Sequence, residues 1–232
     1  MIELYALTSP NVQKIFIALE ELGLPYTVHI VDVFKNENFK PDFRRLNPNG
    51  KIPVIVDSEG PGGAPYTVFE SGAILLYLAD KTGRLMPTDK RAYFDAMQWL
   101  MVQLTGVGPM FGQYTHFKRF AAAGNEYSVS RYQTEVRRLY DVLNQRLSEN
   151  AYLGGPEYTM VDIATFPWTR NHQFQNVNLD EVPNVKRWFE AISARAPVQR
   201  ALAKVDAIPT ARDTAAPEAL DRLFGRGEHA RA

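Results

Sequence analysis

The sequence predicts an α/β domain followed by an all-helical domain, and two observations lead to this prediction. Strand and helix patterns alternate over residues 1–84, whereas no convincing strand pattern follows residue 88. The chain has 232 residues, of which 45% are hydrophobic and 22% are charged, an ordinary globular balance for one large or two modest domains. We therefore expect domains at 1–84 and 88–205. Residues 206–232, rich in Ala, Arg and Pro without periodicity, are expected to form a loosely ordered tail.

The first elements form a strand–helix–strand unit. Residues 2–7 alternate loosely and indicate a strand, and residues 25–32 indicate a second one. Between them, apolar residues recur at helical spacing up to a C-terminal Gly23: Val12, Ile15, Phe16, Leu19 and Leu22. A unit of this kind implies parallel strands joined by a right-handed crossover.

The rest of the first domain predicts a hairpin and a closing helix. Residues 34–46 indicate loop and short helix, and residues 54–56 indicate a strand. A turn or longer hairpin loop over 58–65 leads to a fourth strand at 66–69. Residues 70–72 then lead into a mostly apolar helix over 73–79, which closes near Gly83. The order β-α-β-(α)-β-β-α is the thioredoxin-like arrangement.

The second domain is predicted to be a helical bundle. Helices are expected over 92–104 with Thr88 as cap, over 110–120 after a kink at 106–109, and from Asn125 or Ser128 to Leu147. Later helices are expected over 182–194 and 197–205. The strongest local signal is Thr159 followed three residues later by Asp162, a capping box that opens another helix.

Composition excludes several classes of function. Lys+Arg and Asp+Glu both number 26, and no basic stripe indicates nucleic acid or a membrane surface. No apolar run approaches the ~20 residues of a membrane span. The segment Met1–Tyr5 lacks a basic region and an apolar core, so it is not expected to be a signal peptide, and a cytoplasmic location is expected.

The chain contains no cysteine, which excludes disulfides, thiolate metal sites and a protein thiol nucleophile. Its four histidines, at 29, 116, 172 and 229, lack metal-ligand spacing, so no metal is expected. If the protein performs thiol chemistry, the sulfur must arrive with a ligand.

A proline directly precedes the predicted third strand, within residues 47–57. The sequence of this segment is Asn-Pro-Asn-Gly-Lys-Ile-Pro-Val-Ile-Val-Asp. Ile52 is pushed towards an extended conformation, and the Ile52–Pro53 bond can be cis. A cis bond would turn the Ile52 backbone outward to pair with a peptide-like ligand. The alternative is a loop that merely enters an edge strand.

Three motifs in this order resemble those of cytosolic glutathione transferases: residues 47–53 the cis-proline loop, Phe-Glu-Ser-Gly-Ala-Ile at 69–74 the γ-glutamyl site, and Thr159 with Asp162 the buried helical cap. The resemblance covers about residues 1–205. Ser9-Pro10-Asn11, the run from Phe69 to Ala79, residues 108–113 and residues 131–133 further resemble the bacterial Nu class. That class is related to the yeast nitrogen-regulation prion protein, and its members bind two glutathiones or glutathione disulfide and reduce disulfides.

The resemblance implies a glutathione site. Ile52 would pair its backbone with the cysteinyl part, and Ser71, at a helix N-terminus, would take the γ-glutamyl carboxylate. Glu70 would hold the ammonium group. Lys51 and Asn38 would reach the glycyl end. On local sequence alone, Glu70 and Ser71 could form an ordinary helix cap.

The ligand thiol needs activation, because an unperturbed thiol has a pKa of about 8.5. Asn11 and Ser9 lie at the start of the first helix, where amide, hydroxyl and N–H groups can stabilise a thiolate. Asn11 could instead be only an N-cap. Tyr5 is a rival, since some classes use an N-terminal tyrosine, although we interpret it as a strand residue.

Arg131 would be a solvated surface arginine on most amphipathic helices, but the resemblance implies that it holds a carboxylate of a second glutathione. The aromatic cluster at Phe111, Tyr114, His116 and Phe117 is more typical of core than of a substrate pocket.

The expected function is glutathione-dependent reduction of a small-molecule disulfide, with or without conjugation of an electrophile. The alternatives are a conventional conjugating transferase and a non-catalytic glutathione-binding module. The resemblance also implies a homodimer, with contacts from residues 66–78 and 88–103.

Overall fold

The computed structural model describes residues 1–212 and 214–225. These residues divide into two compact units, one formed by residues 1–77 with the chain from 200 onward, the other by residues 78–199. These compact units do not coincide with the predicted domains 1–84 and 88–205 and the predicted tail 206–232. The predicted domain boundaries stay a prediction. Each unit is described below by itself.

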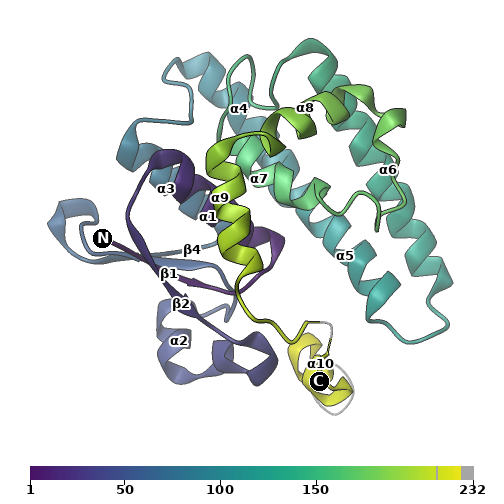
Figure 1. The fold of residues 1–232 in the computed structure, drawn as a ribbon, viewed down its shortest axis with the longest axis horizontal. Coiled ribbons are helices and arrows are strands. Elements are labelled where there is room, and N and C mark those ends of the chain that lie inside the picture. Colours follow the sequence, from purple (N-terminus) through teal and green to yellow (C-terminus); the bar gives the residue numbers. More distant parts are fainter. Residues whose placement is uncertain (213, 226–232) are drawn as a thin grey trace. The chain divides into compact units, whose positions relative to one another are not determined.

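The first unit is built on a four-stranded mixed sheet in the order β2-β1-β3-β4 (Figure 1). β1 (Ile2–Ala6) pairs parallel with β2 (Tyr26–Ile30) and antiparallel with β3 (Val54–Asp57), which pairs antiparallel with β4 (Tyr66–Phe69). Leu4 is opposite Val28 on one side and Ile55 on the other. This is the predicted thioredoxin-like arrangement of one parallel unit followed by a hairpin.

Helices cover both faces of this sheet. Figure 1 shows α1 (Pro10–Leu22) and α3 (Ser71–Thr82) on one face and α2 (Pro41–Leu46) on the other. Strand residues alternate accordingly, since Leu4 is fully buried while its neighbour Tyr5 packs with Phe43, Val31 and Val54 on the α2 face. α1 ends at Gly23 in the left-handed region (φ 69°), as the sequence predicts.

The C-terminal segment adds two helices, α9 (Ala196–Asp206) and α10 (Pro217–Phe224). The prediction that this segment lacks periodicity is wrong for α10, because Leu220, Leu223 and Phe224 have helical spacing and α10 contacts the short 3₁₀ turn Val33–Lys35. Residues 213 and 226–232 of the expected tail lie outside the described residues.

The second unit is helical and has no β-strand among its described residues, apart from an isolated bridge between Tyr152 and Gly155. Its longer helices are α4 (Lys90–Val102), α5 (Gly108–Arg119), α6 (Glu126–Glu149), α7 (Met160–Thr169) and α8 (Pro183–Ser193). A π-helical segment, Gln103–Val107, joins α4 to α5 where the sequence predicts a kink. The predicted cap Thr88 is wrong, because Asp89 accepts the Ala92 N–H at 2.9 Å instead.

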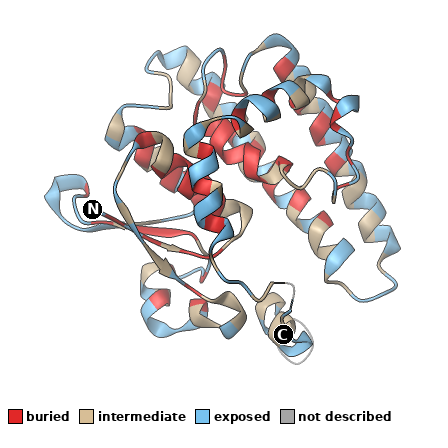
Figure 2. Cartoon of the chain, viewed as in Figure 1, coloured by how far each residue is buried: buried red, intermediate tan, exposed pale blue. Residues whose placement is uncertain are grey.

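α7 is the central helix of this unit and contacts α4, α5 and α8. All its residues except Trp168 are buried, and the ribbon of α7 is accordingly mostly red in Figure 2. The predicted capping box is confirmed, with Thr159 as N-cap and Asp162 as the third helical residue. The Asp162 carboxylate also accepts hydrogen bonds from the Leu153 N–H and the Trp188 indole, both at 2.8 Å.

Candidate functional site

The proline loop precedes β3 and is held by its own side chains. The Ile52–Pro53 peptide is cis. The buried Asn47 donates its amide to the Lys51 carbonyl at 2.7 Å and accepts the Asn49 N–H at 2.9 Å, which is an Asx turn. The β1–β3 register starts at Val54, so the backbone N–H and C=O of Ile52 lie outside the sheet ladder.

A second support for this loop comes from Asn38, which is buried and donates its Nδ2 to the Gly50 carbonyl at 2.9 Å. Gly50 has φ +65°, and a Cβ there would lie 2.8 Å from Nη1 of Arg44, so the turn requires glycine. Asn38 therefore braces the loop. Its direct contact with a glycyl carboxylate, like that of the exposed Lys51, stays a prediction.

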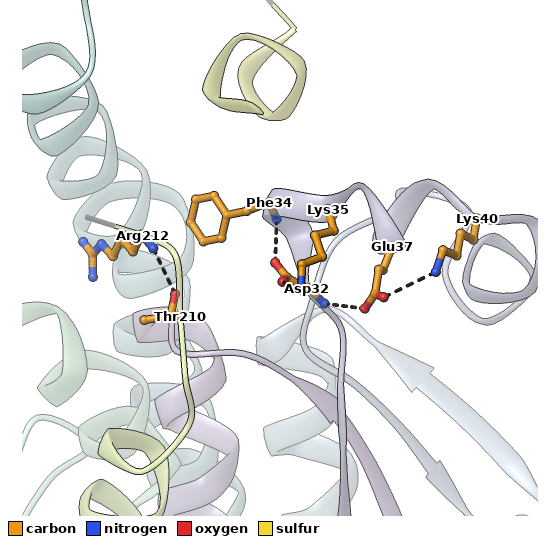
Figure 3. A network of polar contacts seen from close by, with 7 residues as sticks. All are labelled: Asp32, Phe34, Lys35, Glu37, Lys40, Thr210 and Arg212. Carbon is orange, nitrogen blue, oxygen red and sulfur yellow. Dashed lines mark hydrogen bonds and ion pairs between the residues drawn. The ribbon is translucent and has the colours of Figure 1, made fainter. Parts of the chain in front are cut away.

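The segment that carries Asn38 is organised by a polar network, drawn in Figure 3. Asp32 Oδ1 caps the 3₁₀ turn by accepting the Phe34 N–H at 3.0 Å, and Glu37 Oε2 accepts the Asp32 N–H at 2.8 Å. Lys35 and Lys40 pair with these two carboxylates. This network fixes the turn Glu37–Phe39, and with it the position of Asn38.

Glu70 and Ser71 stand at the start of α3. The first backbone hydrogen bond of the helix runs from the Ile74 N–H to the Glu70 carbonyl at 2.9 Å, so the earlier N–H groups have no intrahelical acceptor. Glu70 has φ +69°, a conformation that non-glycine residues rarely adopt. Its exposed carboxylate accepts a hydrogen bond from Asn49 of the proline loop at 3.3 Å. The loop and the helix start therefore form one surface.

The start of α1 meets the start of α3. Ser9 is the N-cap of α1, since its Oγ accepts the Val12 N–H at 3.4 Å, and Asn11 is the second helical residue. The interpretation of Asn11 as an N-cap is therefore wrong. The Ser71 hydroxyl donates to the Asn11 Oδ1 at 3.5 Å, which brings together two residues 60 positions apart.

A residue that sequence reasoning missed completes this cluster. Lys14 is 1% exposed and donates from Nζ to the Ser71 Oγ at 3.2 Å. Burial lowers the pKa of Lys14 to about 7, and the nearby Glu70 carboxylate opposes this shift. The sequence carries no direct signal for it, because helical spacing predicts a solvent-facing side for Lys14, whereas α1 is buried on all sides from Val12 to Leu19.

Tyr5, the rival for thiol activation, is a residue of β1 as interpreted. Its ring stacks on His29 at a centroid distance of 4.8 Å, and its hydroxyl donates to Glu3 at 3.4 Å. Burial and the Glu3 carboxylate raise the pKa of Tyr5 above its ordinary value. These contacts occupy the hydroxyl within the strand.

Arg131 lies on α6 in the second unit. Its Nη1 is 2.7 Å from Oε1 of Glu135, whose other oxygen pairs with Arg138 at 2.9 Å. Two guanidinium groups thus share one carboxylate. The role of Arg131 in binding a ligand stays a prediction.

Of the four aromatic-cluster residues of α5 that the sequence indicates as core, two are fully buried. Phe111 and Tyr114 are fully buried, and Phe111 stacks on Tyr140 at 5.1 Å.

Across residues 1–212 and 214–225, no group of three or more His, Cys, Asp or Glu side chains is arranged to hold a metal ion. Over the same ranges, no helix has both the length and the apolar character that crossing a bilayer demands.

Two family models match the chain. Residues 8–81 match the glutathione S-transferase N-terminal domain, and residues 108–196 match the C-terminal domain of the same family. The disulfide-bond oxidoreductase YfcG of Escherichia coli is 46% identical over 205 residues, which cover 88% of this chain and 95% of that protein. The chain belongs to the glutathione S-transferase family.

Solved structures of similar sequence carry glutathione. A glutathione transferase from Burkholderia graminis, with two glutathione molecules bound per subunit, has 46% identity and a TM-score of 0.83, and 89% of each chain is covered. One from Pseudomonas putida, with one glutathione disulfide bound per subunit, has 41% identity and a TM-score of 0.83 over 87% of this chain and 90% of that one. The predicted family and fold are therefore confirmed.

Proposed function

We propose that this protein is a glutathione-dependent disulfide-bond reductase of the bacterial Nu class, which uses glutathione thiols in place of a protein cysteine. The observation that carries the proposal is the contact between Asn11 and Ser71, which joins a thiol-activating helix start to an anion-binding helix start in a chain without cysteine. The similarity to a disulfide-bond oxidoreductase supports the reaction type.

Glutathione binds along the surface formed by the proline loop and the start of α3. Its cysteinyl backbone pairs with the N–H and C=O of Ile52, which lie outside the sheet ladder. Its γ-glutamyl carboxylate meets Ser71 and the first N–H groups of α3, where the helix dipole favours an anion. Glu70 takes the ammonium group, and Lys51 and Asn38 face the glycyl end.

Asn11 stabilises the thiolate. Because its Oδ1 accepts from Ser71, the Nδ2 group is the part of the amide that donates to a ligand. The N-terminus of α1, capped by Ser9, adds the positive end of a helix dipole. Both effects lower the pKa of a bound thiol and raise its thiolate fraction at neutral pH.

The reaction consumes two glutathiones. The first thiolate attacks one sulfur of the substrate disulfide, so that a mixed disulfide forms and one substrate thiolate leaves. The second glutathione thiolate attacks the glutathione sulfur of that mixed disulfide and releases the other substrate thiolate. Two electrons pass to the substrate, and glutathione disulfide is the product. Two bound glutathiones in the Burkholderia graminis protein support this stoichiometry, with Arg131 as the residue for the second one.

The proposal extends to location and assembly. We place the protein in the cytoplasm, where glutathione is kept reduced. We also propose a homodimer whose contacts include β4 and α4, because both elements carry exposed large apolar side chains: Tyr66 and Phe69 on β4, Phe94 and Met101 on α4.

The test measures the turnover of hydroxyethyl disulfide in the presence of glutathione. A coupled assay monitors the formation of glutathione disulfide. We expect wild-type protein to be active and Asn11→Ala to lose about 100-fold in kcat/KM, since one donor to a developing thiolate is removed. Calorimetric affinity for S-methylglutathione, which has no thiol, should change less than threefold in this variant. A wild-type protein that binds glutathione but turns over no disulfide would instead be a non-catalytic binding module.

A further inference from the structure

Residues 33–39, which carry Asn38, have little apolar support of their own. They form two short 3₁₀ turns between β2 and α2, and within this range only Asn38 is buried. A segment with few buried apolar contacts opens locally at a low cost in free energy. The position of these turns therefore depends on the elements that pack against them.

α10 packs against the first of the two turns, Val33–Lys35. One side of the helix is apolar and partly buried: Ala219, Leu220, Leu223 and Phe224. Glu218 and Arg222 lie on the opposite side and are exposed. Val33 and Phe34 of the turn are partly buried as well, and Figure 3 shows the Phe34 side chain directed away from Glu37. The apolar side of α10 therefore supplies cover that the turn lacks.

Hydrogen bonds link this turn to the one that carries Asn38. Asp32 Oδ1 accepts the Phe34 N–H at 3.0 Å, and the Glu37 N–H donates to the Asp32 carbonyl at 3.2 Å. Glu37 Oε2 in turn accepts the Asp32 N–H at 2.8 Å. The two turns therefore keep a fixed geometry relative to each other, so that support of the first also holds the second.

Asn38 connects the turns to the proline loop. Its Nδ2 donates to the Gly50 carbonyl at 2.9 Å, whereas its buried Oδ1 has no hydrogen-bond partner among residues 1–212 and 214–225. A side chain that is hydrogen-bonded at one end only keeps its position through its own backbone. The location of Gly50, and with it that of the Ile52 backbone two residues later, therefore depends on the turns.

We propose that α10 positions the proline loop for glutathione, because its apolar side holds the turn Val33–Lys35 and Asn38 transmits this support to Gly50. The inference rests on the proposed function, since it takes glutathione as the ligand. Leu220 and Leu223 are positioning residues in this role, and they act through the turns without touching the ligand. Coupling between two sites is reciprocal, so bound glutathione stabilises the docked α10 by the same factor.

The experiment releases α10 in the full-length protein. Leu220→Asp with Leu223→Asp places two negative charges on the packed side of the helix. Arg222→Asp, on the exposed side, lowers the net charge by the same amount and is the matched control. We expect the double variant to bind S-methylglutathione about tenfold more weakly by calorimetry, a coupling of the usual size, and the control to bind within about twofold of wild type.

A double-mutant cycle with Asn38→Ala tests the route of the coupling. If α10 acts through Asn38, the two leucine substitutions should weaken binding less than about twofold further in the Asn38→Ala background. If Asn38→Ala does not fold, amide hydrogen exchange decides. The Gly50 N–H, which donates to the Asn47 carbonyl at 2.9 Å, should then exchange about tenfold faster in the leucine variant than in wild type.

Two further readouts separate positioning from a general loss of stability. Saturating S-methylglutathione should slow amide exchange of α10 in the wild type about tenfold, as reciprocity requires. The pKa of the thiol of bound glutathione, followed by thiolate absorbance at saturation, should be the same in the leucine variant and wild type. Asn11 and Ser9, proposed to stabilise the thiolate, belong to the start of α1 and not to the turns.

Additive losses in the double-mutant cycle would show that α10 acts by another route, such as direct contact with the ligand, and would overturn the inference. Unchanged affinity in a variant whose α10 amides exchange freely would do the same. Wild-type protein that binds no S-methylglutathione would contradict the proposed function and this inference with it. Binding with the expected coupling but without disulfide turnover would contradict the reductase function alone.

Discussion

Glu70 shows at the scale of one residue how the fold orients a group that we propose to bind the ligand. Its left-handed backbone, φ +69°, is unfavourable for a residue with a Cβ and lies directly between β4 and α3. Asn49 fixes its carboxylate from the neighbouring loop at 3.3 Å. The strained turn therefore starts α3 at Ser71 while it keeps the Glu70 carboxylate on the exposed side of the site.

Arg131 can be tested at the same scale. If it holds a carboxylate of the second glutathione, Arg131→Ala should reduce the calorimetric stoichiometry of glutathione from two per chain to one, or weaken the second binding step at least about tenfold. Arg137→Ala is the matched control, because Arg137 lies on the same helix and pairs with Glu181 at 2.7 Å. A stoichiometry of two with unchanged affinities in Arg131→Ala would contradict this role.

At the scale of elements, α1 explains why some of the site could be predicted and some could not. Apolar spacing and Gly23 predict the helix and its end correctly. The same spacing puts Lys14 on the polar side, yet residues Val12 to Leu19 are buried without interruption. Periodicity assumes one solvent-facing side, so sequence reasoning does not reveal the burial of a lysine in a helix that is enclosed on all sides.

The proline loop gives the opposite result. Asn-Pro and Asn-Gly turns and the proline before β3 are local signals, and the loop, the cis bond and the strand follow them. The brace from Asn38 to Gly50 depends on a separate segment, positioned by the network of Asp32 and Glu37 (Figure 3). Sequence alone indicates such contacts between segments only by resemblance to a family.

The capping box of α7 provides a prediction for an element. Asp162 is fully buried and accepts from four donors, two on Thr159, one on Leu153 and one on Trp188. An asparagine would direct its amide hydrogens at some of these donors, so Asp162→Asn should destabilise the protein by about 3 kcal/mol or more. Thermal unfolding should then shift down by about 6–12 °C.

Two control variants should destabilise the protein less than Asp162→Asn. Thr159→Ala removes the cap hydroxyl but leaves the carboxylate, and should cost only about 1 kcal/mol. Asp95→Asn changes an exposed aspartate on α4 and should leave the midpoint within about 1 °C. If Asp162→Asn melts with the wild type, the carboxylate is not what holds the start of α7.

At the scale of the whole molecule, the residues proposed for the first glutathione and the buried cap of α7 lie in different units. The residues proposed for the first glutathione, from Ser9 to Ser71, all belong to the first unit, whereas the buried cap of α7 belongs to the second. The C-terminal segment returns to the first unit, where Arg200 and Lys204 pair with Glu20 of α1 at 3.0 and 2.6 Å. Two ion pairs thus link α1, the helix that carries Asn11 and Lys14, to the C-terminal segment.

The proposed homodimer is tested at this scale. Phe94 and Met101 are 55% and 40% exposed and lie seven residues apart on α4, so they share one helix face. We expect wild-type protein to sediment at twice the mass of one chain, and Phe94→Glu with Met101→Glu to sediment as a monomer, because a charge on each subunit would be buried at the contact. Tyr127→Glu, at an 82% exposed position on α6, is the control and should remain dimeric.

The same variant separates assembly from binding. The groups proposed to contact the first glutathione come from one chain, so the monomeric variant should keep the wild-type Kd for S-methylglutathione within about threefold. A wild-type monomer at micromolar concentration would refute the dimer and leave the reductase proposal standing. Loss of glutathione binding together with loss of the dimer would show that the partner subunit completes the site, which would overturn the assignment of binding to residues of a single chain.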